Sequence, residues 1–343
     1  MNSIQRIKAA LAGHFPDTTP ILLHNFLMAV KEAGITHGQY RESPELIAKT
    51  HLQAAESYGL DGVLIDLDTV VLSGALGVPV DLPDDFPARS HEALISSLEE
   101  VDNLPFSPDI SHHKYVQIVL EAARVLVKSA GNQLYIRGNC DQAAFSLACS
   151  LRTPAEFLMD IMDPDNAERV HRLLDYCCRA ACQFIQQMAQ TGVPMTSNGD
   201  SPAGPAMISP AMYCEFALPY EQRIAAAAKA AGTDYMLHIC GDTGIILDDL
   251  VKVGASAYEL DYKTDINDIH RIIGPAAAFS GNIDPTGVLV YGSPELVAEK
   301  TRELLNVYRD NPRFILNAGC AIPAETPPEN LKAMIRTARE FYR

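Results

Sequence analysis

The chain has 343 residues, of which 48% are hydrophobic and 20% are charged, a composition typical of a folded globular protein. Its 27 basic and 43 acidic residues give a net charge of −16, which argues against nucleic acid or an anionic membrane surface as a partner. No window approaches 18 uncharged apolar residues, and the first residues, MNSIQRIKAALAGHFP, lack the apolar core of a signal peptide. We therefore expect a cytoplasmic protein.

The predicted elements alternate between short strands and longer helices along the whole chain. Eight runs are predicted as strands: 21–25, 62–67, 134–138, 193–198, 235–240, 257–262, 277–282 and 314–319. Helices are predicted over 43–59, 219–232 and 293–310. Ser43-Pro44 and Ser293-Pro294 each place a capping serine before a proline at the first helical position.

This alternation predicts a parallel sheet, and eight units favour a closed (β/α)8 barrel over an open sheet. The long intervals after residues 25, 67 and 138 leave room for inserted helices and active-site loops. Because no linker rich in Gly, Ser or Pro divides the chain, residues 1–343 are predicted to form a single domain.

Polar side chains gather where the predicted strands end, and in a parallel barrel those ends carry the active site. In chain order they are His24 and Asn25, Asp66 and Asp68, Arg137, Asn139 and Cys140, Asp200, His238 and Cys240, Glu259 and Asp261, Asn282 and Asp284, and Cys320. We expect these groups to face one another across the same rim.

The fifth predicted strand leads into the stretch YMLHICGDTG, residues 235–244. It is consistent with a core strand, with half of a disulfide or with part of a metal site. A chain without a secretion signal belongs to a reducing compartment, which argues against the disulfide. His238 and Cys240 lie two residues apart on a strand and so share a face, and a closed barrel brings Cys320 to the same rim.

One imidazole and two thiolates are soft donors that suit zinc better than magnesium or calcium. Three protein ligands with an exchangeable fourth position are typical of a catalytic zinc site. Asp261, or Glu259 on the same strand face, could hold that fourth position until a substrate arrives. A buried core strand with two reactive residues remains the alternative at this point.

Three segments carry a resemblance to a known family. They read HICGDTGIILDDLVKVGASAYELDYKTD, FSGNIDPTGVLVYGSPELV and LNAGCAIPAETPPENLKAM. They resemble the uroporphyrinogen decarboxylase superfamily and, within it, the zinc-dependent, corrinoid-linked methyltransferases. That branch includes coenzyme M methyltransferases and O-demethylase methyltransferases. Residues 61–83 and 208–224 extend the resemblance over essentially the whole chain.

The resemblance implies a (β/α)8 TIM barrel with an N-terminal helical extension. It also implies a zinc site formed by His238, Cys240 and Cys320, with Asp261 at the first position of the branch's acidic pair. The corrinoid would be carried by a separate partner protein that docks at the C-terminal rim of the barrel. A methyl group would move between a small donor or acceptor and the corrinoid cobalt.

Two features bear on the substrate. The segment LHNFLMAVKEAGI, residues 23–35, lacks the arginines with which decarboxylases of this superfamily bind porphyrinogen carboxylates, although Asp68 matches the aspartate that holds the pyrrole nitrogens in those enzymes. The same segment resembles the O-demethylase branch, so we expect a methoxylated aromatic donor. A methylcobalamin:thiol methyltransferase of the coenzyme M type and a porphyrinogen decarboxylase are the alternatives.

The predicted site is therefore as follows. The predicted catalytic residues are Asp261, Glu259 and Asp68, the predicted substrate-binding residues are His24, Asn25, Asp66, Arg137, Asp200 and Asn282, and the predicted metal ligands are His238, Cys240, Cys320 and Asp261. The sequence leaves the oligomeric state open, a homodimer included.

Overall fold

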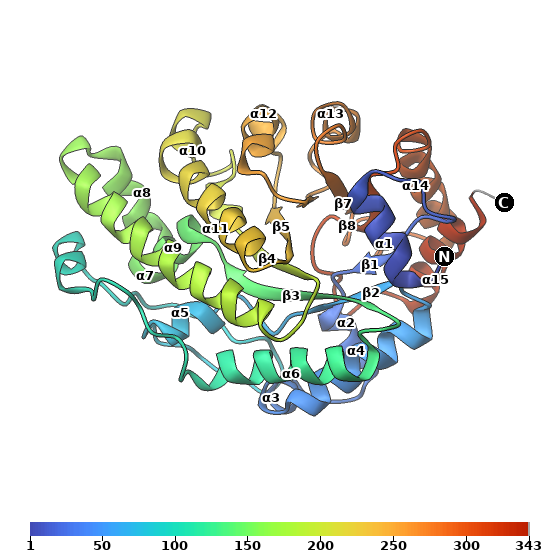
Figure 1. The fold of residues 1–343 in the computed structure, drawn as a ribbon, viewed down its shortest axis with the longest axis horizontal. Coiled ribbons are helices and arrows are strands. Elements are labelled where there is room, and N and C mark those ends of the chain that lie inside the picture. Colours follow the sequence, from blue (N-terminus) through green and yellow to red (C-terminus); the bar gives the residue numbers. More distant parts are fainter. Residues whose placement is uncertain (342–343) are drawn as a thin grey trace.

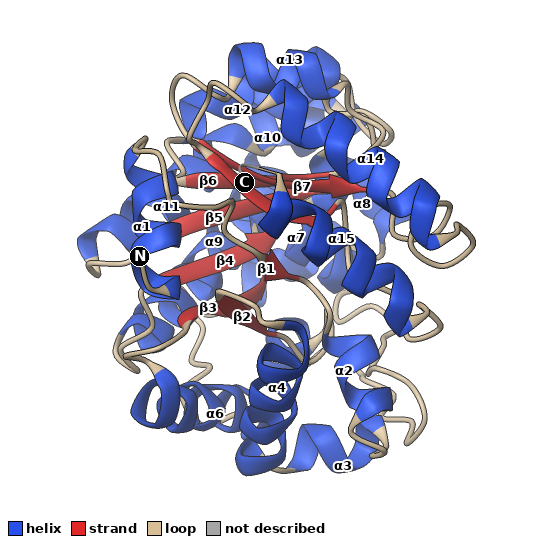
Figure 2. Cartoon of the chain, turned by 90° about the vertical axis from the view of Figure 1, so that its right-hand side faces the viewer, coloured by secondary structure: helices blue, strands red, loops and turns tan. Residues whose placement is uncertain are grey.

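The fold is a closed barrel of eight parallel strands surrounded by helices (Figures 1 and 2). The computed structural model describes residues 1–341. The strands are β1 (Leu22–Leu23), β2 (Gly62–Ile65), β3 (Tyr135–Gln142), β4 (Met195–Gly199), β5 (Asp234–Ile239), β6 (Ala257–Leu260), β7 (Ala278–Ile283) and β8 (Phe314–Ala318). Each strand pairs in parallel with the next along the chain, and a parallel bridge between Ile21 and Leu316 joins the first strand to the last. The predicted (β/α)8 barrel is confirmed.

Helices connect the strands and cover the outside of the barrel, as Figure 2 shows around the red strands. The α-helices are α1 (Ser3–Ala12), α2 (Phe26–Glu32), α3 (His37–Glu42), α4 (Pro44–Tyr58), α5 (Val71–Ala75), α6 (Lys114–Ala130), α7 (Ala144–Arg152), α8 (Pro154–Met162), α9 (Ala167–Ala189), α10 (Pro210–Phe216), α11 (Leu218–Ala230), α12 (Leu247–Leu250), α13 (Ile266–Ile272), α14 (Pro294–Val307) and α15 (Pro328–Glu340). The 3-10 turns are η1 (Leu98–Asn103), η2 (Pro164–Asn166), η3 (Ser201–Ala203), η4 (Gly244–Ile246) and η5 (Val251–Val253). Within residues 1–341, no helix is both long and apolar enough to cross a membrane.

The predicted helix starts are observed. The Ser43 hydroxyl accepts a hydrogen bond from the backbone N–H of Leu46, and Ser293 does the same for Leu296. Each serine thus satisfies one backbone donor at the start of its helix, α4 or α14, and the proline that follows has no N–H to lose. The three long intervals hold inserted helices as predicted: α2 and α3 after β1, α5 after β2, and α7 and α8 after β3.

The side chains inside the barrel form two layers. On every strand, the residue of the upper layer lies two positions after the residue of the lower layer. The lower layer is apolar and takes one residue from each strand: Leu22, Leu64, Tyr135, Met195, Met236, Ala257, Ala278 and Ile315. Ile7 and Ala10 of α1 pack against this layer and plug the N-terminal end of the barrel. Burial of this apolar surface stabilises the closed barrel.

The upper layer consists of polar residues. Since side chains two residues apart on a strand share a face, the next inward positions are His24, Asp66, Arg137, Ser197, His238, Glu259, Ser280 and Asn317. These residues are buried or nearly so, and a buried polar group must find a partner. Their mutual hydrogen bonds hold the floor of the site described below.

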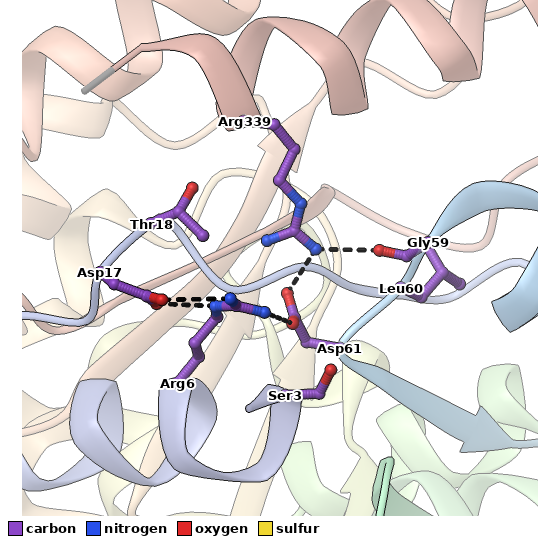
Figure 3. A pocket seen from close by; sticks show the side chains of 8 residues that line it. All are labelled: Ser3, Arg6, Asp17, Thr18, Gly59, Leu60, Asp61 and Arg339. Carbon is purple, nitrogen blue, oxygen red and sulfur yellow. Dashed lines mark hydrogen bonds and ion pairs between the residues drawn. The ribbon is translucent and has the colours of Figure 1, made fainter. Parts of the chain in front are cut away.

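The N-terminal face of the barrel carries a separate charged network (Figure 3). Asp61, which is fully buried at the start of β2, accepts from Arg6 of α1 at 3.1 Å and from Arg339 of α15 at 2.7 Å. Its second oxygen also accepts from the backbone N–H of Ile21. Asp17 completes the network through Arg6. One carboxylate therefore fixes the first helix, the last helix and the first strand.

Candidate metal centre

Three potential metal ligands converge at the C-terminal rim. His238 Nε2 lies 3.0 Å from Cys240 Sγ and 3.9 Å from Cys320 Sγ, and the two sulfur atoms are 3.5 Å apart. Among the described residues, these three form the one group of His, Cys, Asp or Glu side chains compact enough to hold a metal ion. His238 lies in β5, Cys240 follows the end of that strand, and Cys320 lies in the loop after β8, eighty positions later. Their convergence was predicted from the barrel.

The spacing of the three atoms fits zinc. Zn–S bonds of about 2.3 Å and Zn–N bonds of about 2.0–2.1 Å at tetrahedral angles place two sulfurs about 3.8 Å apart and sulfur about 3.6 Å from nitrogen. The three observed separations scatter around these values. The cysteines are free, and their 3.5 Å separation is far longer than the ~2.05 Å of a disulfide.

A glycine allows Cys320 to reach this position. A side-chain carbon added at Gly319 would lie 2.7 Å from the backbone nitrogen of Tyr262. Because that neighbour is main chain, it could not move aside without disturbing the end of β6. Gly319 therefore lets the loop after β8 pass close to β6 and bring the thiol of Cys320 to β5.

The His238 ring is fixed through its other nitrogen. Nδ1 lies 3.1 Å from the backbone oxygen of Glu259 and 3.4 Å from the Glu259 carboxylate. The two residues are paired in register across β5 and β6. A proton on Nδ1 donated to these oxygens leaves the Nε2 lone pair free to bind a metal.

Glu259 was predicted as the substitute for Asp261 at the fourth metal position, but its side chain lies elsewhere. Its side chain lies on the Nδ1 side of the His238 ring and pairs with the buried Arg137. Burial raises the pKa of Glu259, but the charge of Arg137 and the hydrogen bond to His24 outweigh it and hold that pKa below its ordinary value. This placement argues against direct metal binding and makes Glu259 a residue that orients the ligand.

His24 is held between two carboxylates. Its Nε2 lies 2.7 Å from Asp66 and its Nδ1 lies 3.3 Å from Glu259. Burial lowers the pKa of His24, but the hydrogen bonds to Asp66 and Glu259 raise it to about 9, so the ring is an imidazolium at neutral pH. With both nitrogens engaged, His24 has no donor left for the substrate contact predicted for it.

Asp66 and Arg137 are similarly engaged inside the protein. Asp66 accepts a second hydrogen bond from Asn139 at 2.7 Å. Arg137 donates to Ser197 at 2.8 Å as well as to Glu259. The polar layer thus contains its own ion pairs, so its charged side chains are engaged with one another.

The two thiols share one proton. The hydrogen bond from Cys320, aided by His238 and opposed by burial, lowers the pKa of Cys240 to about 3. The same contact, together with burial, raises the pKa of Cys320. Cys240 is therefore the thiolate of the pair. Its backbone N–H also donates to the Ser201 hydroxyl at 3.1 Å.

Asp261 lies next to the group without belonging to it. Its carboxylate accepts from the backbone N–H of Gly241 at 2.9 Å and of Lys263 at 3.2 Å. Asn282 donates to the Asp261 backbone oxygen at 3.3 Å. The Asp261 carboxylate thus braces the backbone directly after Cys240, and its role as the fourth ligand stays a prediction.

The other predicted residues lie in different surroundings. Asp200 is fully buried and accepts from the backbone N–H and hydroxyl of Ser146, which argues against a substrate contact. Asp68 accepts from the backbone N–H of Val70, and burial raises its pKa to about 7. Asn25 is buried at the end of β1, and its Nδ2 has no hydrogen-bond partner.

Sequence reasoning missed Ser197, Ser201 and Asn317. Ser197 and Asn317 follow the lower apolar layer by two residues on β4 and β8, so strand periodicity could have found them. Asn317 accepts from the backbone N–H of His24. Ser201 lies in η3, where no periodicity assigns a direction to a side chain.

Comparison with known proteins identifies the family. The model of the uroporphyrinogen decarboxylase (URO-D) family matches residues 2–341. The chain therefore belongs to this family, as its motifs predicted.

The named relatives have two different activities. The methylcobamide:CoM methyltransferase MtbA of Methanosarcina acetivorans is 31% identical over 226 residues, which cover 66% of this chain and 64% of that protein. The methylcobamide:CoM methyltransferase MtaA of Methanosarcina barkeri is 25% identical over 98% of this chain and 97% of its own. The uroporphyrinogen decarboxylase of Syntrophotalea carbinolica is 28% identical over 86% of this chain and 83% of its own.

The fold has a close counterpart among solved structures. A methyltransferase from Methanosarcina mazei superposes with a TM-score of 0.89, covers 100% of both chains and is 23% identical.

Proposed function

We propose that this member of the uroporphyrinogen decarboxylase family is a zinc-dependent methyltransferase. It moves a methyl group between a small donor or acceptor and the cobalt of a corrinoid carried by a partner protein. The observation that carries the proposal is the group of His238, Cys240 and Cys320, whose atoms have the identities and separations of three zinc ligands. The relatives named as methylcobamide:CoM methyltransferases support the corrinoid.

The chain's own residues prepare the site for this reaction. His238 donates a hydrogen bond from Nδ1 to the Glu259 backbone oxygen, and Cys240 is a thiolate because its pKa is lowered. The Ser201 hydroxyl accepts a hydrogen bond from the backbone N–H of Cys240. A zinc ion held there would act as a Lewis acid toward the oxygen or sulfur that loses or gains the methyl group. Asp261, next to Cys240, would occupy the fourth position and give way to the substrate.

The rim around this group is suited to a protein partner. An exposed apolar residue follows each of four successive strands: Met207 after β4, Ile245 after β5, Tyr262 after β6 and Tyr291 after β7. Exposed apolar side chains that gather around one opening are typical of an interaction surface. They support docking of the corrinoid protein over the C-terminal rim, where its cobalt would face the metal group.

The substrate is either a methoxylated aromatic compound or a thiol. We favour the aromatic donor, on the resemblance of residues 23–35 to the O-demethylase branch. A thiol acceptor is the alternative, because two relatives are named for CoM. Arg137 was the one strand-end cation that could have held an anionic thiol, and its pairing with the buried Glu259 removes it from that role.

A porphyrinogen decarboxylase fits the site less well, although some relatives carry that name. Decarboxylation of a polyanionic substrate needs free cations near the mouth. Arg41, which follows the segment without arginines, donates to the backbone oxygens of Pro83 and Phe86 and is buried. Decarboxylation also does not require a group of one imidazole and two thiols.

The test is a methyl-transfer assay. The zinc-loaded protein is mixed with a reduced corrinoid protein and a panel of methoxylated aromatics, and separately with a methylated corrinoid protein and a panel of thiols. The cobalt absorbance should change with at least one member of either panel, and the change should vanish in Cys320→Ala. No change with any donor or thiol would contradict the proposal.

A further inference from the structure

A groove of about 560 Å³ lies outside the barrel, between α9 and α11. The two helices pack side by side (Figure 1). Three of the residues that line the groove are small, so the facing turns of the helices leave a hollow: Cys182 of α9, and Ala226 and Ala227 of α11. The longer side chains around it are those of Arg179, Gln183 and Gln186 of α9, Arg223 of α11, and Ser107. The roles described above do not involve this groove.

Two cysteines of α9 pack against α11 here. Cys182 is partly exposed and lines the groove, whereas Cys178, one helical turn earlier, is fully buried. Their sulfur atoms lie 4.0 Å and 3.7 Å from the backbone oxygens of Arg223 and Tyr220. A hydrogen bond from Cys178 lowers the pKa of Cys182; burial opposes this effect and the charge of Arg223 adds to it. Cys182 is therefore the more reactive thiol of the two, since the thiolate is the nucleophile.

The groove also carries positive charge. Arg179 and Arg223 both pair with Asp175, so two guanidinium groups share one carboxylate beside Cys182. The Arg179 guanidinium lies over the ring of Phe106, 4.4 Å from its centroid. Its Nε is buried and has no hydrogen-bond partner, so this side chain keeps a donor unused. An electropositive, partly exposed setting of this kind is typical of reactive cysteines.

The two thiols do not suit a disulfide with each other. Cys178 and Cys182 are four residues apart in α9, which is continuous from Ala167 to Ala189. Cβ atoms at this spacing are about 5–6 Å apart, whereas a disulfide requires about 3.5–4.5 Å. Cys178 can therefore activate Cys182 but cannot displace a group bound to it without distorting the helix. The thiolate is left to react with a partner from outside the protein.

We propose that Cys182 is a site of mixed-disulfide formation with small disulfides whose halves carry carboxylates, with Arg179 and Arg223 binding the carboxylates. The Cys182 thiolate attacks one sulfur of the small disulfide. The bond from Cys182 to that sulfur forms, the original S–S bond breaks, and the other half leaves as a thiolate. Cys182 is oxidised and the leaving half is reduced, so no further oxidant takes part.

The dimensions and charge of the groove suit such a ligand. Its volume falls within the range of ~300–1,000 Å³ typical of sites for small organic ligands. A planar guanidinium suits a carboxylate because it offers two parallel N–H donors. The glutamines and the serine of the lining add neutral hydrogen-bonding groups for a peptide-like ligand.

The test measures the reaction of the zinc-loaded full chain with oxidised glutathione at pH 7. Mass spectrometry of the peptides gives the rate at each cysteine separately, so the result does not depend on the metal site. Cys182 should react at least about tenfold faster than Cys214. Cys214 is the matched control because it is more exposed than Cys182, while burial and the neighbouring Asp249 raise its pKa.

The variant Arg223→Gln separates binding of the ligand from activation of the thiol. It should slow the reaction of Cys182 with oxidised glutathione roughly five- to tenfold, but that with uncharged hydroxyethyl disulfide only about twofold, because the neutral disulfide senses only the pKa of the thiol. Arg302→Gln, which changes an exposed arginine on α14, should alter neither rate. Cys178→Ala removes the hydrogen bond to Cys182 and should move the pH profile of the rate to higher pH.

Three results would overturn this site. The first is that oxidised glutathione modifies Cys182 no faster than Cys214. The second is that Arg223→Gln slows both disulfides equally or neither. The third is an unchanged pH profile in Cys178→Ala. None of these measurements involves methyl transfer, so the proposed function is tested separately.

Discussion

The two ends of this barrel both gather charged and polar side chains, yet the two sets differ in whether their members satisfy one another. At the N-terminal face, Asp61 is neutralised by Arg6 and Arg339, and Asp17 by Arg6 (Figure 3). At the C-terminal rim, the thiolate of Cys240 faces a second thiol and a histidine. The first set is complete as it stands, whereas the second leaves three donor atoms that could hold a metal ion.

The cavities at the two ends show the same difference. Each has a volume of about 460 Å³. The lower one is lined by Arg6 and Arg339, which already bind Asp61, whereas the upper one is lined by Arg89, which has only a distant contact. Cavity size therefore does not identify a binding site in this protein. The two faces differ instead in whether their polar groups are already paired, in keeping with the division of barrel enzymes into a stability face and a catalytic face.

The largest expected effect is on metal affinity in Cys320→Ala. Structural zinc sites bind with about 10–16 kcal/mol shared among four ligands, so the loss of one thiolate should weaken zinc binding about a thousandfold, or about 4 kcal/mol. Competition with a chromophoric chelator measures this. Cys214→Ala removes an exposed cysteine outside the group and should leave the affinity unchanged. Equal zinc affinity in the wild type and in Cys320→Ala would eliminate the metal site.

The next effect is on stability and should appear at the opposite end. Asp61→Asn leaves Arg6 and Arg339 without a charged partner, which should lower the free energy of unfolding by about 3 kcal/mol. Denaturant titration measures this, and zinc affinity should not change.

Asp102→Asn is the matched control for Asp61→Asn. Asp102 also binds two arginines, Arg169 and Arg172, but its side chain is 40% exposed. Its loss should cost less than about 1 kcal/mol. If the two variants are equally stable, the N-terminal network does not stabilise the fold more than an exposed ion pair does.

The third effect is a pH dependence at the rim. Burial, with Asp66 adding to it, raises the pKa of Asp68 from 3.8 to about 7. The folded protein therefore holds this proton more tightly than the unfolded chain. The stability that results is complete below pH 3.8 and is lost as the pH rises through about 7. Asp68→Asn cannot ionise, so its stability relative to the wild type should increase by about 2.6 kcal/mol between pH 5 and pH 8.

Denaturant titrations of the wild type and Asp68→Asn at several pH values test this. A constant difference between them would show that Asp68 is ionised throughout. A stability difference that grows with pH would instead show that the buried Asp68 carboxyl lowers stability once it ionises. At the N-terminal face, the buried Asp61 is no such group, because it is paired with two arginines.

Much of this arrangement was predictable from the sequence. Each strand is an apolar run that ends in polar residues, so all eight were located, and the closed topology alone brought Cys320 to His238 and Cys240. Period-two alternation along a strand would also have identified Ser197 and Asn317 as inward-facing. These features depend on local pattern and on strand order, which a single sequence contains.

The pairing of side chains across the barrel was not predictable. His24, Asp66 and Glu259 come from β1, β2 and β6, and their contacts depend on packing between strands that are far apart in the chain. Arg89 and Ser201 lie outside the strands, where no periodicity gives a side chain its direction. The sequence therefore predicted the polar residues of the rim. It did not distinguish the side chains that bind one another inside the barrel from those without an internal partner.

The smallest effect distinguishes a residue that supports the metal group from one that only lines the cavity. Ser201 and Ser150 are both serines of the rim cavity, but Ser201 accepts from the backbone N–H of Cys240, whereas Ser150 donates to the backbone oxygen of Ser146 within α7. In Ser201→Ala the Cys240 N–H loses its partner, which should weaken zinc binding by about 1 kcal/mol, or about fivefold. Ser150→Ala should leave it unchanged, because α7 keeps its own backbone bonds. Equal zinc affinities in the two variants would mean that the loop after β4 contributes to the cavity and not to the metal group.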